Sequence, residues 1–144
     1  MKLVSQVLAA KGHDVWSVMP DTTVYEALQL MAEKQVGALL VLGQGKLIGL
    51  FSERDYARKV ILQGKASKDT PVREIMSSKV ICVRPNQSTE ECMSTMTEKR
   101  VRHLPVVENK RLLGVISIGD VVKAVIAEQE EVIEHLEHYI TGVV

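Results

Sequence analysis

Apolar residues along the chain fall either into short dense runs or into a wider, helical spacing. Dense runs at 38–42 and 104–107 are too short for helices and are typical of buried strands. Each is followed by a polar turn and a second apolar run, at 46–51 and 111–116, so each pair is expected to form a hairpin. A further short strand is expected at 15–18.

Helix starts are marked by hydroxyl residues. Thr23 and Ser88 each precede a glutamate by three positions, which is the pattern of a capping box. Behind the first of them, apolar residues recur at helical spacing over 24–31. Two more helices are expected to begin near Ser52 and Ser117, directly after the second strand of each hairpin.

The chain contains an internal duplication. A shift of 65 positions places residues 15–60 on residues 80–125 without a gap, and 15 of the 46 aligned positions are identical. Each copy has the order strand, helix, strand, strand, helix, so the strand at 15–18 is expected to recur at 80–83.

This repeat predicts a mixed α/β (α+β) fold, built from two tandem β-α-β-β-α repeats related by a pseudo-two-fold axis. Residues 1–68 are expected to hold the first repeat with an N-terminal helical segment. Residues 69–144 are expected to hold the second repeat with a long C-terminal helix, after a polar linker at 64–71. One repeat of about 50 residues is small for a core of its own, so the two are expected to share one.

Composition narrows the class of protein. With 144 residues, 46% of them hydrophobic, the chain is too apolar to be disordered. Its 18 basic and 18 acidic residues balance and only five residues are aromatic, which argues against a nucleic-acid partner. The longest apolar run, 36–43, is far below the roughly 20 residues of a membrane helix, and no signal peptide is expected. A cytoplasmic protein without a membrane partner is therefore expected.

The duplication marks two Ser-x-x-Asp pairs at the ends of buried strands. Ser52 with Asp55, and Ser117 with Asp120, are each compatible with a helix cap. A carboxylate at such a junction can equally accept hydrogen bonds from two vicinal hydroxyls, as on a ribose. The other caps carry glutamate, which is expected to reach back to the cap, whereas these pairs carry the shorter aspartate. That difference favours a ligand role beside the cap.

Basic residues lie near both pairs. Arg102 and His103 come where the second hairpin begins, and Arg54, Arg58 and Lys59 surround Asp55 in the sequence. They fit either a solvated turn or a clamp for a phosphate.

The duplicated unit and the two glycine-led endings, Gly49 to Asp55 and Gly114 to Asp120, resemble the cystathionine-β-synthase (CBS) domain pair, or Bateman module. The resemblance covers about residues 10–128. The run from Ser52 to Val60 is similar to that of stand-alone bacterial CBS-pair proteins of the signal-transduction type.

The resemblance implies that the adenosine part of a nucleotide lies in a cleft between the repeats. It implies that Asp55 and Asp120 hold ribose hydroxyls, that the two serines contact ribose or phosphate, and that backbone near Trp16 and Ile81 lines the adenine. The full set of nucleotide-binding residues it implies is Lys11, Trp16, Ser52, Arg54, Asp55, Arg58, Ser77, Ile81, Arg102, His103, Pro105, Ser117 and Asp120.

The expected function is a non-catalytic regulatory sensor that binds AMP, or alternatively ATP, ADP or NAD(H), and signals to an unknown protein target by a conformational change. The alternative is an interaction or structural module that binds S-adenosylmethionine, a metal or nothing. The sequence offers no nucleophile with a paired base, so no enzyme, catalytic residue or catalytic cofactor is expected. His135 and His138 could face a metal, but a solvated charged helix face is the simpler interpretation.

The C-terminal helix is expected to outrun its repeat. Val125, Val132, Leu136 and Ile140 recur at about 3.5-residue spacing among glutamates. Nothing within the repeat could bury that stripe. A homodimer is therefore expected, with packing onto the N-terminal segment as the alternative.

Overall fold

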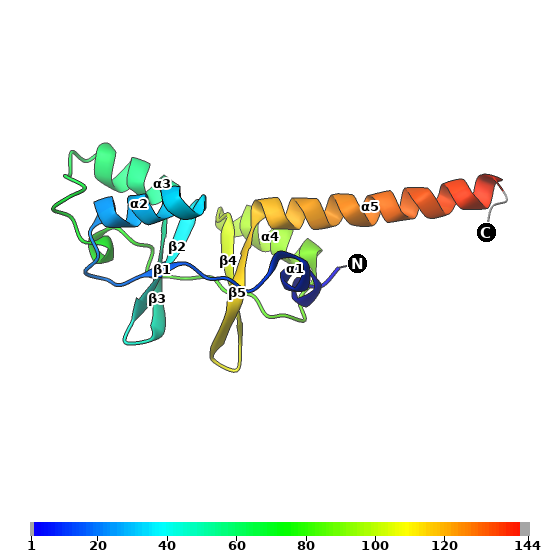
Figure 1. Cartoon of the computed structure of the whole chain (residues 1–144), viewed down its shortest axis with the longest axis horizontal. Coiled ribbons are helices and arrows are strands. Elements are labelled where there is room, and N and C mark those ends of the chain that lie inside the picture. The colour runs from blue at the N-terminus through cyan, green and yellow to red at the C-terminus, as the bar shows by residue number, and fades with distance from the viewer. Residues whose placement is uncertain (1, 142–144) are drawn as a thin grey trace. The chain divides into compact units, whose positions relative to one another are not determined.

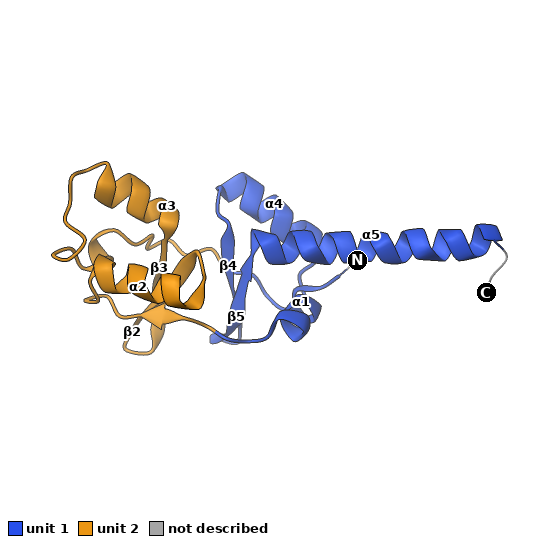
Figure 2. Cartoon of the chain, turned by 45° about the horizontal axis from the view of Figure 1, so that its top comes forward, with its two compact units in different colours: residues 1–14, 82–144 blue, residues 15–81 orange. Residues whose placement is uncertain are grey.

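The computed structural model describes residues 2–141, which form two compact units (Figure 2). One unit contains residues 15–81, and the other contains residues 2–14 together with 82–141. Within residues 2–141, no helix is both long enough and apolar enough to cross a bilayer.

The unit of residues 15–81 is built on a three-stranded sheet (Figure 1). Strand β1 (Ser17–Val18) pairs in parallel with β2 (Ala38–Gly43), which pairs antiparallel with β3 (Lys46–Ser52). Its helical elements are α2 (Val24–Lys34), α3 (Glu53–Tyr56), the π-helical turn η1 (Ala57–Ile61) and the 3₁₀ turn η2 (Val72–Glu74). The core of this unit consists of Val24, Ala27, Met31, Leu39, Val41, Phe51, Val60, Val72 and Ile75.

The other unit is built on a two-stranded sheet, in which β4 (His103–Glu108) pairs antiparallel with β5 (Arg111–Ser117). It also contains α1 (Val4–Lys11), α4 (Thr89–Lys99) and α5 (Ile118–Thr141), which runs well past the rest of the unit (Figure 1).

The strand expected at 80–83 is reduced to one residue. Val83 bridges Val106 in parallel, donating from its N–H to the carbonyl of Pro105 and accepting from the N–H of Val107. The preceding residue, Cys82, is exposed. Because only Val83 exchanges hydrogen bonds with β4, this copy of the repeat has a bridge where the first copy has a short strand.

The duplication is visible in details that the sequence pattern does not show. The hairpin register shifts between Val41 and Leu42 in one unit and between Val106 and Val107, 65 positions later, in the other. Both hairpins also turn through two successive residues with positive φ. The repeats therefore share backbone geometry down to the bulge and the turn.

The compact units differ from the division of the chain expected at residues 68 and 69. Helix α1 packs with the second repeat, where Val4, Val7 and Leu8 are buried. Its start is held by the Val4 N–H, which donates to the carbonyl of Gln87. Leu8 fits against Gly114 of β5, where a Cβ would lie only 2.8 Å from a Leu8 methyl group. The N-terminal segment therefore completes the core of the repeat that is remote from it in sequence.

Candidate functional site

Asp55 lies where β3 ends and α3 begins. Its carboxylate accepts hydrogen bonds from the Ser52 N–H at 2.9 Å and the Ser52 hydroxyl at 3.1 Å, while the Asp55 N–H donates to the Ser52 Oγ at 3.2 Å. The pair is thus a reciprocal capping box that fixes the carboxylate against the strand end.

Two further polar groups converge on the Asp55 carboxylate. The Ser77 hydroxyl donates to it at 3.4 Å, and the Lys59 ammonium lies 3.5 Å away, one helical turn along the chain. Lys59 also donates to the carbonyl of Ile75 at 3.2 Å. The Asp55 side chain is 12% exposed, so it is mostly buried but still in contact with solvent.

Asp120 repeats this arrangement at the end of β5. It accepts from the Ser117 N–H at 2.8 Å, and its own N–H donates to the Ser117 Oγ at 3.2 Å. The Lys11 ammonium donates to the Asp120 carboxylate at 2.6 Å and to the carbonyl of Val115, also at 2.6 Å. Asp120 is 18% exposed.

The surroundings of Asp120 favour its charged form. Burial by itself would raise the pKa of Asp120, but the hydrogen bond from Lys11, the hydrogen bonds from Ser117 and the Lys11 charge together lower it below the ordinary value. Asp120 is therefore ionised at neutral pH and can accept hydrogen bonds, with the Lys11 ammonium beside it.

The cation at each aspartate comes from a different place in the fold. Lys59 belongs to the helical segment that follows Asp55, and its counterpart in the second repeat is Ala124, which has no charge. Lys11 comes instead from the last turn of α1. The two repeats thus form the same kind of carboxylate–ammonium pair, but the lysine comes from a different element in each.

The expectation that the shorter aspartates do not reach back to the cap is wrong. Both aspartates accept from the N–H of their cap serine and so complete a reciprocal capping box. Glu91 of α4 interacts with both the backbone N–H and the hydroxyl of its cap serine, Ser88. The two aspartates therefore cap their helices whatever else they bind.

The structure places the other candidate residues in their own units. In residues 82–144, His103 pairs in register with Ser117, and the Arg102 carbonyl accepts from the Ile118 N–H at 2.9 Å. Pro105 is buried, while the Arg102 side chain is exposed. His103 therefore stands across the hairpin from one serine of the Ser-x-x-Asp pairs, where the first repeat has Ala38 facing Ser52.

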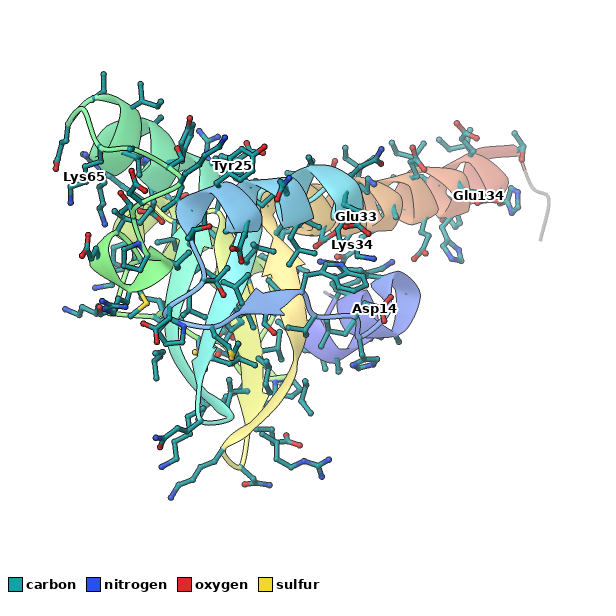
Figure 3. The ribbon with its side chains drawn as sticks, turned by 60° about the vertical axis from the view of Figure 1, so that its left-hand side comes forward. Asp14, Tyr25, Glu33, Lys34, Lys65 and Glu134 are labelled. Carbon is teal, nitrogen blue, oxygen red and sulfur yellow. The ribbon has the colours of Figure 1, made fainter. Side chains whose placement is uncertain are left out.

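In the unit of residues 15–81, Trp16 is partly buried against the core and the Lys34 ammonium lies 4.4 Å from its ring centroid. Figure 3 labels Lys34 beside Glu33 at the end of α2, and the Lys34 Nζ lies 3.8 Å from the Glu33 Oε1. Arg54 and Arg58 are exposed on the segment after Ser52, and Ile81 ends the unit. Trp16 therefore contributes to the packing of its own unit.

Each unit thus brings together part of the expected set. Ser52, Asp55 and Ser77 meet in one unit, and Lys11, Ser117 and Asp120 meet in the other. Lys59 was expected only as charge near Asp55, although its i,i+4 spacing from Asp55 predicts a direct ion pair. Lys11 was expected among the nucleotide-binding residues, but its pairing with Asp120, 109 positions away, has no local signal in the sequence.

Within residues 2–141, no group of three or more His, Cys, Asp or Glu side chains is arranged to hold a metal ion. His135 and His138 lie on the exposed part of α5.

Comparison with known proteins finds relatives whose descriptions name CBS domains. The chain is similar to a signal-transduction-type protein with CBS domains from Burkholderia ambifaria, with 53% identity, a TM-score of 0.87 and coverage of 89% of this chain and 96% of that one. It is 42% identical over 149 aligned positions to the mitochondrial CBS domain-containing protein CBSX3 of Arabidopsis thaliana, covering 96% of this chain and 72% of that protein.

A more distant structure shares the fold alone. The CBS domain pair of protein MJ0100, solved with 5′-methylthioadenosine and S-adenosylmethionine, is 21% identical and superposes with a TM-score of 0.75 over 85% of this chain and 98% of that one.

The family assignment rests on two matches within the chain. The model of the CBS domain matches residues 4–61 and again residues 72–127. The two matches coincide with the internal duplication and with the paired hairpins and capped helices described above. This chain belongs to the CBS-domain family and carries a pair of CBS domains.

Proposed function

We propose that this CBS pair is a non-catalytic sensor of adenine nucleotides. Each repeat offers one carboxylate, Asp55 or Asp120, to the two vicinal hydroxyls of a ribose. The observation that carries the proposal is the duplicated arrangement of a capped, mostly buried aspartate that keeps some exposure to solvent and has a lysine beside it.

The chemistry of each cluster suits a phosphorylated nucleoside. A carboxylate that is already ionised accepts two hydroxyl hydrogen bonds without first losing a proton. A neighbouring ammonium such as Lys11 supplies the positive charge that a phosphate needs. Arg102 and His103 add further donors near Ser117, where the first repeat has Gly37 and Ala38.

The fold supports the ligand class, since MJ0100 holds two adenosine derivatives on the same architecture. We propose AMP as the principal ligand, with ATP, ADP or NAD(H) as alternatives. Ser52, Ser77 and Ser117 would contact ribose or phosphate. The remaining lining residues of the proposed sites are Lys11, Trp16, Arg54, Arg58, Ile81 and Pro105.

Ligand occupancy would act on a partner rather than on a chemical bond. In this proposal the chain works in the cytoplasm as a homodimer. A separate target protein responds to the change in packing that the nucleotide causes. A regulatory role is supported by the Burkholderia ambifaria protein, which is described as a signal-transduction-type protein with CBS domains.

Calorimetry with AMP tests the proposal. Asp120→Asn and Asp55→Asn keep an oxygen that can accept from the cap N–H, but they lose the charge, so each should weaken AMP binding to its own site. We expect a loss of about 10- to 100-fold, since a charge-assisted hydrogen bond contributes roughly 1.5–3 kcal/mol.

Asp69→Asn is the matched control, because Asp69 is exposed and lies in neither cluster. If both site variants bind AMP as tightly as the control does, the aspartates are helix caps only. If binding is seen only with S-adenosylmethionine or a metal ion, the alternative ligand class is correct.

A further inference from the structure

Helix α5 carries a continuous apolar stripe on a side that its own unit does not cover. The only residues of α5 that are buried are Val121 and Ala124, near its start. At 100° per residue, the stripe is centred about 110° around the helix from these two. The stripe consists of Val122, Ile126, Val132, Ile133, Leu136, Tyr139 and Ile140, all of them 43% or more exposed.

The spacing of the stripe is that of a coiled coil. Ile126, Ile133 and Ile140 recur every seven residues. A second set, Val122, Gln129 and Leu136, also recurs every seven residues, and each of its members lies four residues before one of the isoleucines. In heptad terms the isoleucines are a positions and the second set are d positions. β-Branched residues at a favour two parallel strands when leucine is at d, and here the three a positions are isoleucine and one of the three d positions is leucine.

We propose that α5 pairs with α5 of a second copy of this chain as a parallel, in-register coiled coil. The seam defined by the a and d positions is the contact surface. Gln129, the one polar residue of the seam, would meet its own copy and hydrogen-bond there. Any shifted register would bury it against an aliphatic side chain, so it selects the in-register pairing.

The residues beside the seam are compatible with this orientation. The e positions carry Lys123, Glu130 and Glu137, while the g positions carry Val125, Val132 and Tyr139. A parallel pair places each e residue next to a g residue of the partner, so no two glutamates meet. The orientation itself rests on Gln129, because an antiparallel pair sets d positions against a positions and would bury Gln129 against an isoleucine.

The same residues argue against a different partner helix. Specific pairing with another protein is usually written in complementary charges on both e and g positions. Here the g positions are apolar and carry no such code, whereas the glutamates of α5, including the labelled Glu134 in Figure 3, lie outside the seam. A second copy of the chain is the occupant that fits.

Sedimentation of the full chain tests the seam. The variant Ile133→Glu places a charge at a central a position, and His135→Glu adds the same side chain two residues away on the solvent side. We expect the wild type and His135→Glu to be dimers at about 50 μM, and Ile133→Glu to be a monomer.

The outcomes separate this inference from the proposed function. A dimeric Ile133→Glu variant would overturn the seam but leave the proposed dimer in place, whereas a monomeric wild type would overturn both. AMP binding by the Ile133→Glu variant is measured separately and reports on the nucleotide sites. Both substitutions are at exposed positions, and circular dichroism confirms that the variants are folded.

Disulfide cross-linking tests the orientation. In a Cys82→Ser background, Gln129→Cys and Leu136→Cys are oxidised separately, with Glu131→Cys as the solvent-side control. A parallel, in-register pair brings each d position beside its own copy, so both variants should cross-link and the control should not.

An antiparallel pair centred on one of these positions would separate the other from its copy by about 20 Å. Cross-linking of only one variant, or of neither, would therefore overturn the parallel arrangement. Cys92 does not interfere, because burial first, and then the nearby Glu91 charge, raise its pKa to about 11.

Discussion

Single residues in this chain serve two purposes at once. Asp55 and Asp120 each complete a helix cap, which alone would explain why an aspartate follows the serine by three positions. The caps also fix each carboxylate at the end of a buried strand beside a lysine. A capping role and a ligand role are therefore compatible, since the proposed ribose would bind a solvent-accessible part of a carboxylate that the cap has already oriented.

Asp120 should make folding stability depend on pH. Its pKa in the folded protein lies below the ordinary value, so its contribution is present above the unfolded pKa of about 4 and is lost as the pH falls through the folded pKa. Asp120→Asn should lower the free energy of unfolding by about 1–2 kcal/mol at pH 7.

Urea denaturation at several pH values measures this difference, with Asp69→Asn as the control. The gap between the wild type and Asp120→Asn should shrink below pH 4. A gap that stays constant down to pH 2 would contradict the assigned interaction with Lys11 and Ser117.

At the scale of elements, the two hairpins have the same turn but different residues in it. Both central positions have positive φ, occupied by Gln44 and Gly45 in the first hairpin and by Asn109 and Lys110 in the second. Glycine adopts this conformation freely, whereas lysine is strained in it. The second repeat is therefore the less well optimised of the two at this turn.

Exchanging these turn residues should move stability in opposite directions. Lys110→Gly should raise the free energy of unfolding by about 1 kcal/mol, and Gly45→Lys should lower it by about the same amount. Both positions are exposed, and nothing lies within 4 Å of a Cβ built on Gly45, so backbone conformation is the dominant cause. Equilibrium denaturation of both variants checks this, and equal effects of the same sign would contradict it.

Elements with strong local signals were predicted well. The hairpin strands and the helices after Thr23 and Ser88 have periodic patterns and caps, and the structure confirms them. The strand at 80–83 was not predicted correctly, because its formation depends on how many N–H groups reach β4, which the pattern does not encode. The Lys11–Asp120 pair was also missed, since it depends on where α1 packs.

At the scale of the whole molecule, the duplication accounts for most of the architecture. The mixed α/β fold with two tandem repeats and a long C-terminal helix is confirmed. Position along the sequence does not predict which repeat a segment packs against, because residues 2–14 pack with the second repeat rather than the first. A segment remote in sequence thus supplies both core residues and the cation of the Asp120 cluster.

The proposed dimer should respond to salt in a definite direction. Helix α5 carries six acidic residues and one lysine, so pairing two copies of it brings two helices of net negative charge together, even though no two glutamates are in direct contact. Raising the ionic strength screens that repulsion, so dimerisation should tighten by a few-fold between about 0.05 and 0.5 M salt. Sedimentation at both salt concentrations measures the change, and weakening with salt would indicate that oppositely charged surfaces form the contact instead.

The most direct test of the central claim is native mass spectrometry of the full chain with AMP. The account predicts a nucleotide-bound species for the wild type and for Asp69→Asn, and its loss in the double variant Asp55→Asn with Asp120→Asn. Wild-type protein that carries no adenine nucleotide at millimolar AMP, or a double variant that retains it fully, would contradict the claim that the paired aspartates form nucleotide sites.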